Sequence, residues 1–244
     1  MNILSKAKNL LSATKSRQVP NPAKNTNCQK FEVNGWDLSQ FVLERIVPVS
    51  GVHPFPLQEL MLMCASVCRL QPSLIFEWGT NIGKSARIFF ETTEHYGIPC
   101  QIHSIDLPDD VSHVEHPHEQ RGVMVRGLKR VELHQGDGLE TSLSIWKKSG
   151  SPSNPLFFID GDHSYDSVLR EIEGIIQAIP GASMLLHDTF FQTGKSGYNV
   201  GPYQAVEEAL KSFPGRFQVI HSGMSLPGMT ALIFSKKDLT LNDQ

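Results

Sequence analysis

An apolar run that ends in an acid and leads directly into a glycine-spaced turn is the feature that most constrains the fold of this chain. The run covers residues 74–77, and Gly79 and Gly83 follow it with three residues between them. Glycine adopts positive φ and lets a ligand approach the backbone, while the first turn of a following helix presents unpaired N–H groups. Apolar residues then recur at helical spacing, at Ile82, Ala86, Phe89 and Phe90. The segment predicts a buried strand, a turn that binds a nucleotide-type ligand, and a helix packed on a sheet.

Two common phosphate-binding motifs do not fit this turn. The loop of nucleotide hydrolases needs a glycine five residues before Gly83, where this chain has Trp78, although Lys84 and Ser85 follow as that motif requires. The dinucleotide fingerprint needs a glycine at the position of Asn81. An NAD-dependent enzyme is therefore disfavoured, and a nucleotide-binding hydrolase remains a minor alternative.

Four more apolar runs lie downstream, and an acid follows each of them. These acids are Asp106, Asp137, Asp160 and Asp188. The runs alternate with stretches of helical periodicity, which predicts an α/β fold with a doubly wound parallel sheet. In such sheets ligands bind at the carboxyl ends of the strands, so these acids are expected to converge.

The spacing E-x-G-x-x-x-G-x-S, which begins at Glu77, resembles the opening motif of class I S-adenosylmethionine-dependent methyltransferases. The resemblance implies S-adenosylmethionine as cofactor and a Rossmann-like sheet of seven strands in the order 3-2-1-4-5-7-6, with helices on both faces. Its last pair, expected at residues 217–221 and 229–234, would form an antiparallel hairpin. The turn residues implied as cofactor contacts are Glu77, Gly79, Thr80, Asn81, Gly83 and Ser85.

The second and third strand ends extend this resemblance. Asp106 matches the acid that holds the ribose hydroxyls in that family, and an ionised carboxylate can accept hydrogen bonds from both hydroxyls. Gly136 and Asp137 match the acidic turn near the adenine. The resemblance therefore adds these three residues to the predicted cofactor site.

The letters D-G-D-H-S-Y from Asp160 and L-H-D-T around His187 resemble a subgroup of small-molecule O-methyltransferases that act on macrolides, aminocoumarin sugars and cephalosporins. This resemblance covers residues 55 to 235. It implies that Asp160 and Asp188 hold a divalent cation, Mg²⁺ or another, through hard oxygen ligands. His187 stands where well-studied members have a second acid and is predicted as a third ligand, although imidazole suits transition metals better than magnesium. Asp160 is also predicted to contact the cofactor.

His163 and Asp160 are the two candidates for the base that removes the acceptor proton. Histidine titrates near neutral pH, and His163 follows the Asp-Gly-Asp turn expected to face the acceptor. Methyl transfer is an in-line displacement, so alignment and deprotonation are what the protein must supply. The structural alternative is that Asp162 or Ser164 caps the following helix and that His163 is a hydrogen-bonding turn residue.

The chain is predicted to consist of an N-terminal arm or helical extension (residues 1–50), a methyltransferase domain (51–238) and a short tail (239–244). Residues 1–31 contain no acid and six Lys or Arg, which fits a membrane-surface contact, a presequence, an oligomer contact or a frayed basic tail. The segment with His113, His116 and His118 is interpreted as a lid or acceptor loop, and residues 192–201 as a second loop that closes over the acceptor.

Composition narrows the class of protein further. The net charge of −3 over 244 residues gives no sign of a broad nucleic-acid surface, and no apolar run approaches the length of a membrane span. The four cysteines are expected to be reduced thiols. We therefore expect a cytoplasmic enzyme, with a homo-oligomer left open, that methylates a small-molecule hydroxyl on a sugar or polyketide-type acceptor. A nitrogen acceptor, or a regulatory protein that binds S-adenosylmethionine without transferring a methyl group, is the alternative.

Overall fold

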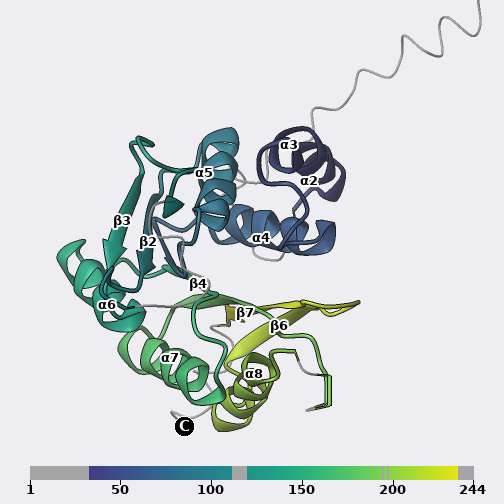
Figure 1. Cartoon of the computed structure of the whole chain (residues 1–244), viewed down its shortest axis with the longest axis vertical. Coiled ribbons are helices and arrows are strands. Elements are labelled where there is room, and N and C mark those ends of the chain that lie inside the picture. The colour runs from purple at the N-terminus through teal and green to yellow at the C-terminus, as the bar shows by residue number, and fades with distance from the viewer. Residues whose placement is uncertain (1–32, 112–119, 194, 197, 236–244) are drawn as a thin grey trace, which may run out of the picture.

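A single seven-stranded sheet forms the centre of the computed structural model, which describes residues 33–111, 120–193, 195–196 and 198–235 (Figure 1). The basic arm, the three-histidine segment, Cys28 and the tail lie outside the described residues. The strand order is β3-β2-β1-β4-β5-β7-β6, which confirms the predicted order. The strands are β1 (Leu74–Trp78), β2 (Gln101–Asp106), β3 (Val131–Gln135), β4 (Leu156–Ile159), β5 (Ser183–His187), β6 (Phe217–Ser222) and β7 (Met229–Phe234).

The first five strands run parallel, and β7 is antiparallel to both of its neighbours, β5 and β6. The predicted hairpin is therefore confirmed. Because the carboxyl ends of parallel strands meet at one edge of a sheet, the turns after β1, β2, β4 and β5 lie together. Central strands β1, β4 and β5 are buried along their whole length, as expected for strands with helices on both faces.

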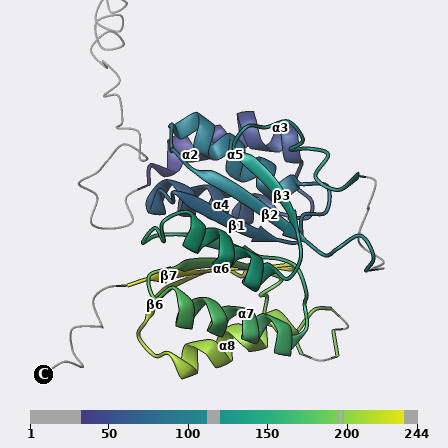
Figure 2. The same cartoon turned by 90° about the vertical axis from the view of Figure 1, so that its left-hand side faces the viewer.

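Helices cover both faces of the sheet in two separate layers (Figure 2). One layer contains α4 (Leu57–Leu70) and α5 (Lys84–Tyr96), and the other contains α6 (Gly138–Lys148), α7 (Tyr165–Ala178) and α8 (Gly201–Ser212). Each layer has its own apolar cluster against the sheet. No helix among the described residues is both long and apolar enough to cross a bilayer.

A short helical extension precedes the first strand. It consists of α2 (Gly35–Phe41), a π-helical stretch η2 (Val42–Ile46) and α3 (Val47–Ser50). Its buried residues Leu38, Phe41, Val42 and Ile46 belong to the same apolar cluster as α4 and α5. The extension is therefore built onto the domain, while the predicted boundary at residue 50 remains a prediction. Cys64, Cys68 and Cys100 are free, buried thiols, as expected.

Candidate active site

The turn after β1 has the backbone conformation that its glycines were predicted to supply. Gly79 has φ +91°, and a Cβ there would lie 2.2 Å from the carbonyl oxygen of Asp160. Gly83 has φ +87° and directly precedes α5, where a Cβ would lie 2.9 Å from the Val125 side chain. Any larger residue at either position would be strained and crowded. The turn is therefore pressed closely against the end of β4 and the segment around Val125.

Glu77 lies beneath this turn in a buried polar layer. Its Oε1 accepts a 2.5 Å hydrogen bond from Ser104 Oγ, and Ser104 Oγ lies 2.7 Å from Thr80 Oγ1. Its second oxygen has no hydrogen-bond partner, and burial raises the pKa of Glu77 to about 7. Glu77 is absent from the walls of both cavities described below, whereas Thr80, Asn81 and Ser85 line the second. The structure thus places Glu77 where it supports the turn from below.

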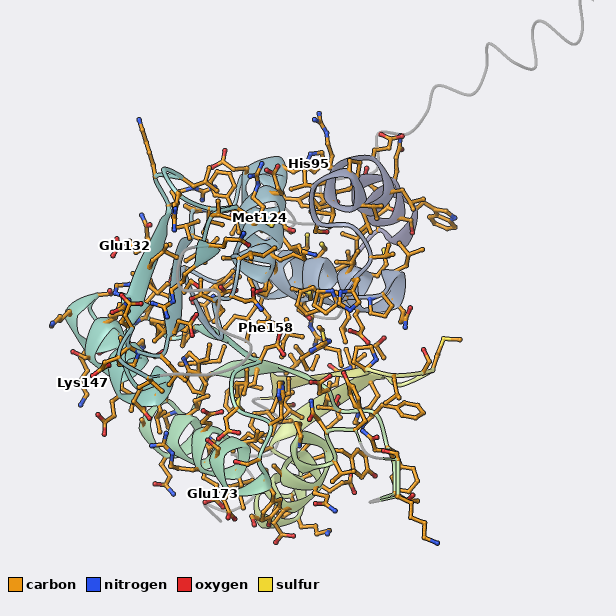
Figure 3. The ribbon with its side chains drawn as sticks, in the orientation of Figure 1. His95, Met124, Glu132, Lys147, Phe158 and Glu173 are labelled. Atoms are coloured by element: carbon orange, nitrogen blue, oxygen red, sulfur yellow. The ribbon has the colours of Figure 1, made fainter. Side chains whose placement is uncertain are left out.

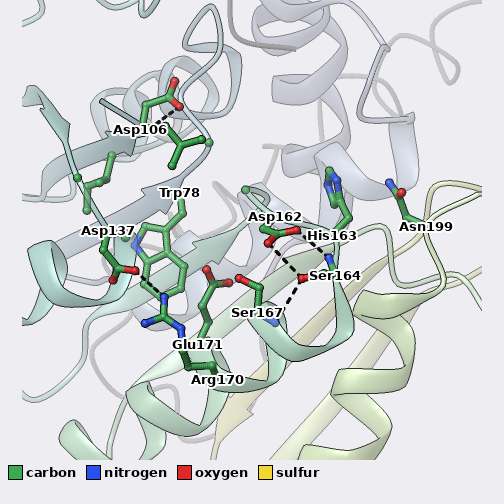
Figure 4. A pocket seen from close by; sticks show the side chains of 16 residues that line it. Trp78, Asp106, Asp137, Asp162, His163, Ser164, Ser167, Arg170, Glu171 and Asn199 are labelled. Carbon is green, nitrogen blue, oxygen red and sulfur yellow. Dashed lines mark hydrogen bonds and ion pairs between the residues drawn. The ribbon is translucent and has the colours of Figure 1, made fainter. Parts of the chain in front are cut away.

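A cavity of about 590 Å³, which we call the first cavity, opens beside the turn (Figure 4). Its walls come from Trp78 and Gly79, from the end of β2, from residues 136–138 and from the start of α7. Asp106 lies in this wall as predicted, but its carboxylate is already engaged. Oδ1 accepts from the Leu107 N–H at 2.8 Å, and Oδ2 lies 3.3 Å from the Asn81 nitrogen and 3.2 Å from Arg121 Nε. Sequence reasoning missed Arg121.

Asp137, predicted near the adenine, has a structural role in the same wall. It is the N-cap of α6, where Oδ1 accepts from the Glu140 N–H at 2.9 Å, and Oδ2 forms an ion pair with Arg170 at 2.5 Å. Burial alone would raise the pKa of Asp137, but the hydrogen bonds from Glu140 and Arg170 outweigh it and lower the pKa. Gly136 lies beside it in the wall.

Glu171, which lines the first cavity, is another residue that sequence reasoning missed. It is only 7% exposed, and its Oε2 has no hydrogen-bond partner. Burial raises the pKa of Glu171 to about 8. The sequence could have identified Glu171, because it falls on the apolar face of α7 together with Val168, Ile172 and Ile175, which are buried. An acid on that stripe indicates either a buried partner or a ligand-facing site.

The second cavity, of about 480 Å³, lies on the other side of the turn. It is lined by residues 53–55, by the glycine turn and start of α5, and by the ends of β4 and β5. Gly79, Gly161, His163 and Asn199 line both cavities. The two cavities therefore adjoin, and His163 stands at their junction.

His187, at the end of β5, joins three elements. Its Nδ1 lies 2.9 Å from Asp160 Oδ1, and its Nε2 lies 3.1 Å from Oε2 of Glu59 on α4. Burial would lower the pKa of His187, but Asp160 and Glu59 outweigh it and raise the pKa to about 10. Contact with these two carboxylates favours the imidazolium form, in which both ring nitrogens donate. Glu59 is fully buried and also accepts from the Gly228 N–H at 2.9 Å.

Asp188 and His163 form the second half of this network. Asp188 accepts hydrogen bonds from Tyr198 Oη at 2.8 Å and Asn199 Nδ2 at 3.0 Å, so the predicted closing loop does reach the acids. His163 Nε2 lies 3.0 Å from Asp188 Oδ2 and 3.7 Å from Asp160 Oδ1, in ion-pair contacts without hydrogen-bond alignment.

The charges of this network shift the pKa values of its members in opposite directions. The interactions of His163 with Asp160 and then Asp188 raise its pKa to about 10. Burial would raise the pKa of Asp188, but His163 and His187 outweigh it and lower the pKa to about 2. These contacts favour the protonated form of His163 and the ionised form of Asp188.

The predicted metal ligands Asp160, His187 and Asp188 do come together. One ligand atom from each lies within 4.8 Å of the others. The carboxylates of Asp160 and Asp188 are suitable oxygen ligands for a hard divalent cation. His187 differs, because both of its ring nitrogens are engaged by Asp160 and Glu59. The donor set fits a cation through the two aspartates.

The capping alternative for the turn after β4 is also seen. Ser164 is the N-cap of α7 and accepts from the Ser167 N–H at 3.4 Å, while Asp162 accepts from the Ser164 N–H at 2.9 Å. Asp162 also lines the first cavity. These two residues fix the start of α7 and with it the position of His163.

A sheet of this order, with a glycine turn after β1 and acids at the neighbouring strand ends, defines the class I methyltransferase fold. Residues 76–189 match the family described as a methyltransferase domain. The sequence match covers a little under half of this chain, and it agrees with the fold and with the resemblance to class I S-adenosylmethionine-dependent methyltransferases. The resemblance found in the sequence is confirmed.

Individual relatives are similar at low identity. The rhamnosyl O-methyltransferase of Mycobacterium leprae is 24% identical over an alignment of 162 residues that covers 61% of this chain and 63% of that protein. This chain thus matches less than two thirds of the length of that relative. The S-adenosylhomocysteine-bound methyltransferase PaMTH1 of Podospora anserina has a TM-score of 0.53 and 16% identity, covering 96% of this chain and 98% of its own. The TDP-rhamnose 3'-O-methyltransferase CalS11 has a TM-score of 0.54 and 14% identity, covering 81% and 93%.

Proposed function

We propose that this chain transfers the methyl group of S-adenosylmethionine to a hydroxyl of a small-molecule acceptor, and that the acceptor carries a deoxysugar of the rhamnose type. The names of two similar proteins, a rhamnosyl O-methyltransferase and a TDP-rhamnose 3'-O-methyltransferase, support the acceptor class. The chain is not expected to act on nucleic acid. Its cytoplasmic location and oligomeric state remain predictions.

The single observation that carries the proposal is the pair of adjoining cavities with ionised groups at their junction. In this proposal the ribose and adenine of the donor lie in the first cavity, beside Asp106 and residues 136–138, and the glycine turn lines the second cavity. Asp160, His163 and Asp188 line the second cavity beside that turn. A donor bound along the turn would therefore present its methyl group to an acceptor held by these three residues.

The chemistry requires one displacement and one proton transfer. The acceptor oxygen forms a bond to the methyl carbon, the carbon–sulfur bond breaks, and S-adenosylhomocysteine leaves. Of the two predicted bases, we favour Asp160, because its carboxylate lines the second cavity beside the glycine turn and is held in place by His187. His163 would then stabilise the developing alkoxide by its positive charge.

A divalent cation has a defined place in this proposal. Asp160 and Asp188 would hold it, and when bound it would lower the pKa of the acceptor hydroxyl. We assign His187 a positioning role in place of its predicted role as a ligand, because its two nitrogens hold Asp160 and Glu59 in place. Of the other predicted cofactor contacts, Gly79, Thr80, Asn81, Ser85, Asp106 and Gly136 line the cavities and keep that role in the proposal.

The test is an assay with S-adenosylmethionine and two acceptors, TDP-rhamnose and an aryl rhamnoside, read by mass spectrometry for a methylated product. The assay is run with and without a chelator, to measure the part played by a cation. We expect a product of one added methyl group with at least one acceptor. If the chain binds S-adenosylhomocysteine yet methylates no hydroxylated compound of a wider panel, the alternative of a regulatory binding protein is favoured instead.

A further inference from the structure

Away from both cavities, three potential metal ligands meet between β2 and the edge strand β3. His103 lies on β2, and Glu132 and His134 lie on β3. His103 Nδ1 is 3.0 Å from His134 Nε2, and Glu132 Oε2 is 3.7 Å from the first of these nitrogens and 3.8 Å from the second. Figure 3 shows Glu132 on the outer edge strand, while Phe158 lies in the interior. None of the three ligands lines either cavity.

These three separations match the coordination sphere of one transition-metal ion. A point equidistant from three atoms at these separations lies about 2 Å from each, which is the usual distance from zinc to imidazole nitrogen or carboxylate oxygen. Two imidazoles and one carboxylate are a ligand set for zinc and similar metals, whereas magnesium and calcium prefer oxygen alone. The same three residues thus meet both the distance and the chemical requirement.

We propose that His103, Glu132 and His134 bind a divalent transition metal of the zinc type, with a fourth position open to solvent, and that this metal fastens β3 to β2. Edge strand β3 has only one neighbour in the sheet, β2. The strand leads directly into Gly136 and Asp137, which form part of the wall of the first cavity. A metal at this position would therefore stabilise edge strand β3 next to the wall of the first cavity.

The surroundings of the cluster suit a metal site that is partly preformed. The ring of His103 is buried and stacks on Phe76 with the centroids 5.4 Å apart, which fixes its orientation. The Glu132 side chain is 59% exposed, so an ion can reach the cluster from solvent. The contact between the two rings requires a hydrogen on one of the facing nitrogens. A change of tautomer would move that hydrogen to the far side of its ring and free both facing nitrogens for the metal.

The experiment measures zinc binding to the full chain after removal of metal with a chelator. The stoichiometry and affinity are determined by competition with a chromophoric chelator for wild type, H134Q and E132Q. Matched controls are H221Q, an exposed histidine on the opposite edge strand β6, and E140Q, an exposed acid on α6. Because each variant is compared with wild type, zinc bound elsewhere on the chain cancels out.

We expect H134Q and E132Q to lose one equivalent of zinc, or to bind it at least about tenfold more weakly, while H221Q and E140Q match wild type. Zinc should also raise the melting temperature of wild type and both controls by more than it raises that of H134Q or E132Q. If H134Q fails to fold, the exposed position of Glu132 keeps E132Q informative. Equal zinc binding in all five proteins would overturn the proposal and leave His103 and His134 as a hydrogen-bonded pair.

Discussion

The acids of the first cavity and the acids of the second have different kinds of partner. In the first, Asp106 and Asp137 are each engaged by one arginine and by backbone N–H groups. In the second, His163 and His187 are shared among carboxylates from different elements. Asp106 and Asp137 are thus each neutralised locally, whereas Asp160 and Asp188 of the second cavity are held in one connected network.

This difference has a physical consequence for substitutions. If one member of a local pair is removed, the loss of free energy is about the interaction energy of that pair. If one member of a buried network is removed, the remaining charges are left uncompensated, and the loss is larger. In the proposed function, the connected network lies where the acceptor proton leaves and charge develops, and the local pairs lie where the cofactor is held. The comparison predicts large, coupled effects in the second cavity and smaller, separable effects in the first.

The largest effect is expected for D160N. The change removes the proposed base and one proposed cation ligand but keeps the shape of the side chain. We expect kcat to fall by about a thousandfold or more, with S-adenosylhomocysteine affinity changed less than about threefold. The measurements are steady-state kinetics and calorimetry. Loss of cofactor affinity equal to the loss of turnover would instead make Asp160 mainly a cofactor contact.

The next largest effect is expected for E59Q; Glu59 lies in α4 and lines neither cavity, but it contacts His187 in the wall of the second. Glutamine can still accept from the Gly228 N–H, but it leaves the His187 imidazolium with Asp160 as its main counter-charge. We expect the free energy of unfolding to fall by about 3 kcal/mol, because a buried ion pair is broken. Urea unfolding measures this, with E44Q on the exposed surface as control.

Turnover separates a positioning role for Glu59 from a purely structural one. If Glu59 positions Asp160 through His187, kcat should fall in E59Q while KM for the acceptor stays nearly constant, and the pH profile of kcat should shift. The double variant E59Q/D160N should then be little slower than D160N alone. If the losses in kcat of the two single variants add up in the double variant, the two residues act independently. The second cavity would then not contain a connected network.

The sheet and the acids at the strand ends were predictable from sequence, because both follow from short patterns. The run before Glu77, the glycine spacing and the acids after each later run predicted the strand order by resemblance and the meeting of Asp160 with Asp188. Parallel topology alone brings carboxyl ends together, so no long-range information was needed for those residues.

The partners of these acids were not predictable, because they come from distant segments. Glu59 lies 128 residues before His187, and an acid in the first turn of a helix normally indicates only a favourable helix terminus. Arg121 belongs to a stretch without helical or strand periodicity, so nothing in the sequence pointed to its contact with Asp106. Local patterns therefore locate the functional carboxylates, while the groups that set their charge are fixed only by tertiary packing.

A smaller effect, which depends on pH, is expected for E171Q in the first cavity. The pKa of Glu171 is about 8 in the folded chain and near 4.5 when exposed, so between these values the folded chain holds a proton that the unfolded chain has released. The contribution of Glu171 to the free energy of unfolding therefore falls as the pH rises from about 4.5 to about 8, by about 1.4 kcal/mol per pH unit. Glutamine does not titrate, so E171Q should gain about 2 kcal/mol relative to wild type between pH 6 and pH 8.

The measurement for Glu171 is urea unfolding of both proteins at pH 6 and pH 8, with E173Q as the matched control on the same helix. Both residues lie on α7, but Glu173 is partly exposed, so its replacement should leave the wild-type pH dependence almost unchanged. Parallel pH profiles for wild type and E171Q would mean that Glu171 is ionised in the folded chain. The first cavity would then contain an uncompensated charge and would resemble the second more than we propose.

The smallest effects are expected at Asp137, where two variants separate its two contacts. Asparagine caps a helix about as well as aspartate, so D137N should remove only the partly exposed ion pair with Arg170 and cost less than about 1 kcal/mol. D137A should lose the cap as well and cost about 1 kcal/mol more. Both should bind S-adenosylhomocysteine within a few-fold of wild type, as measured by calorimetry. A hundredfold loss of affinity in D137N would mean that the charge of Asp137 contacts the cofactor directly, and the contrast between local pairs and a connected network would no longer separate the two cavities.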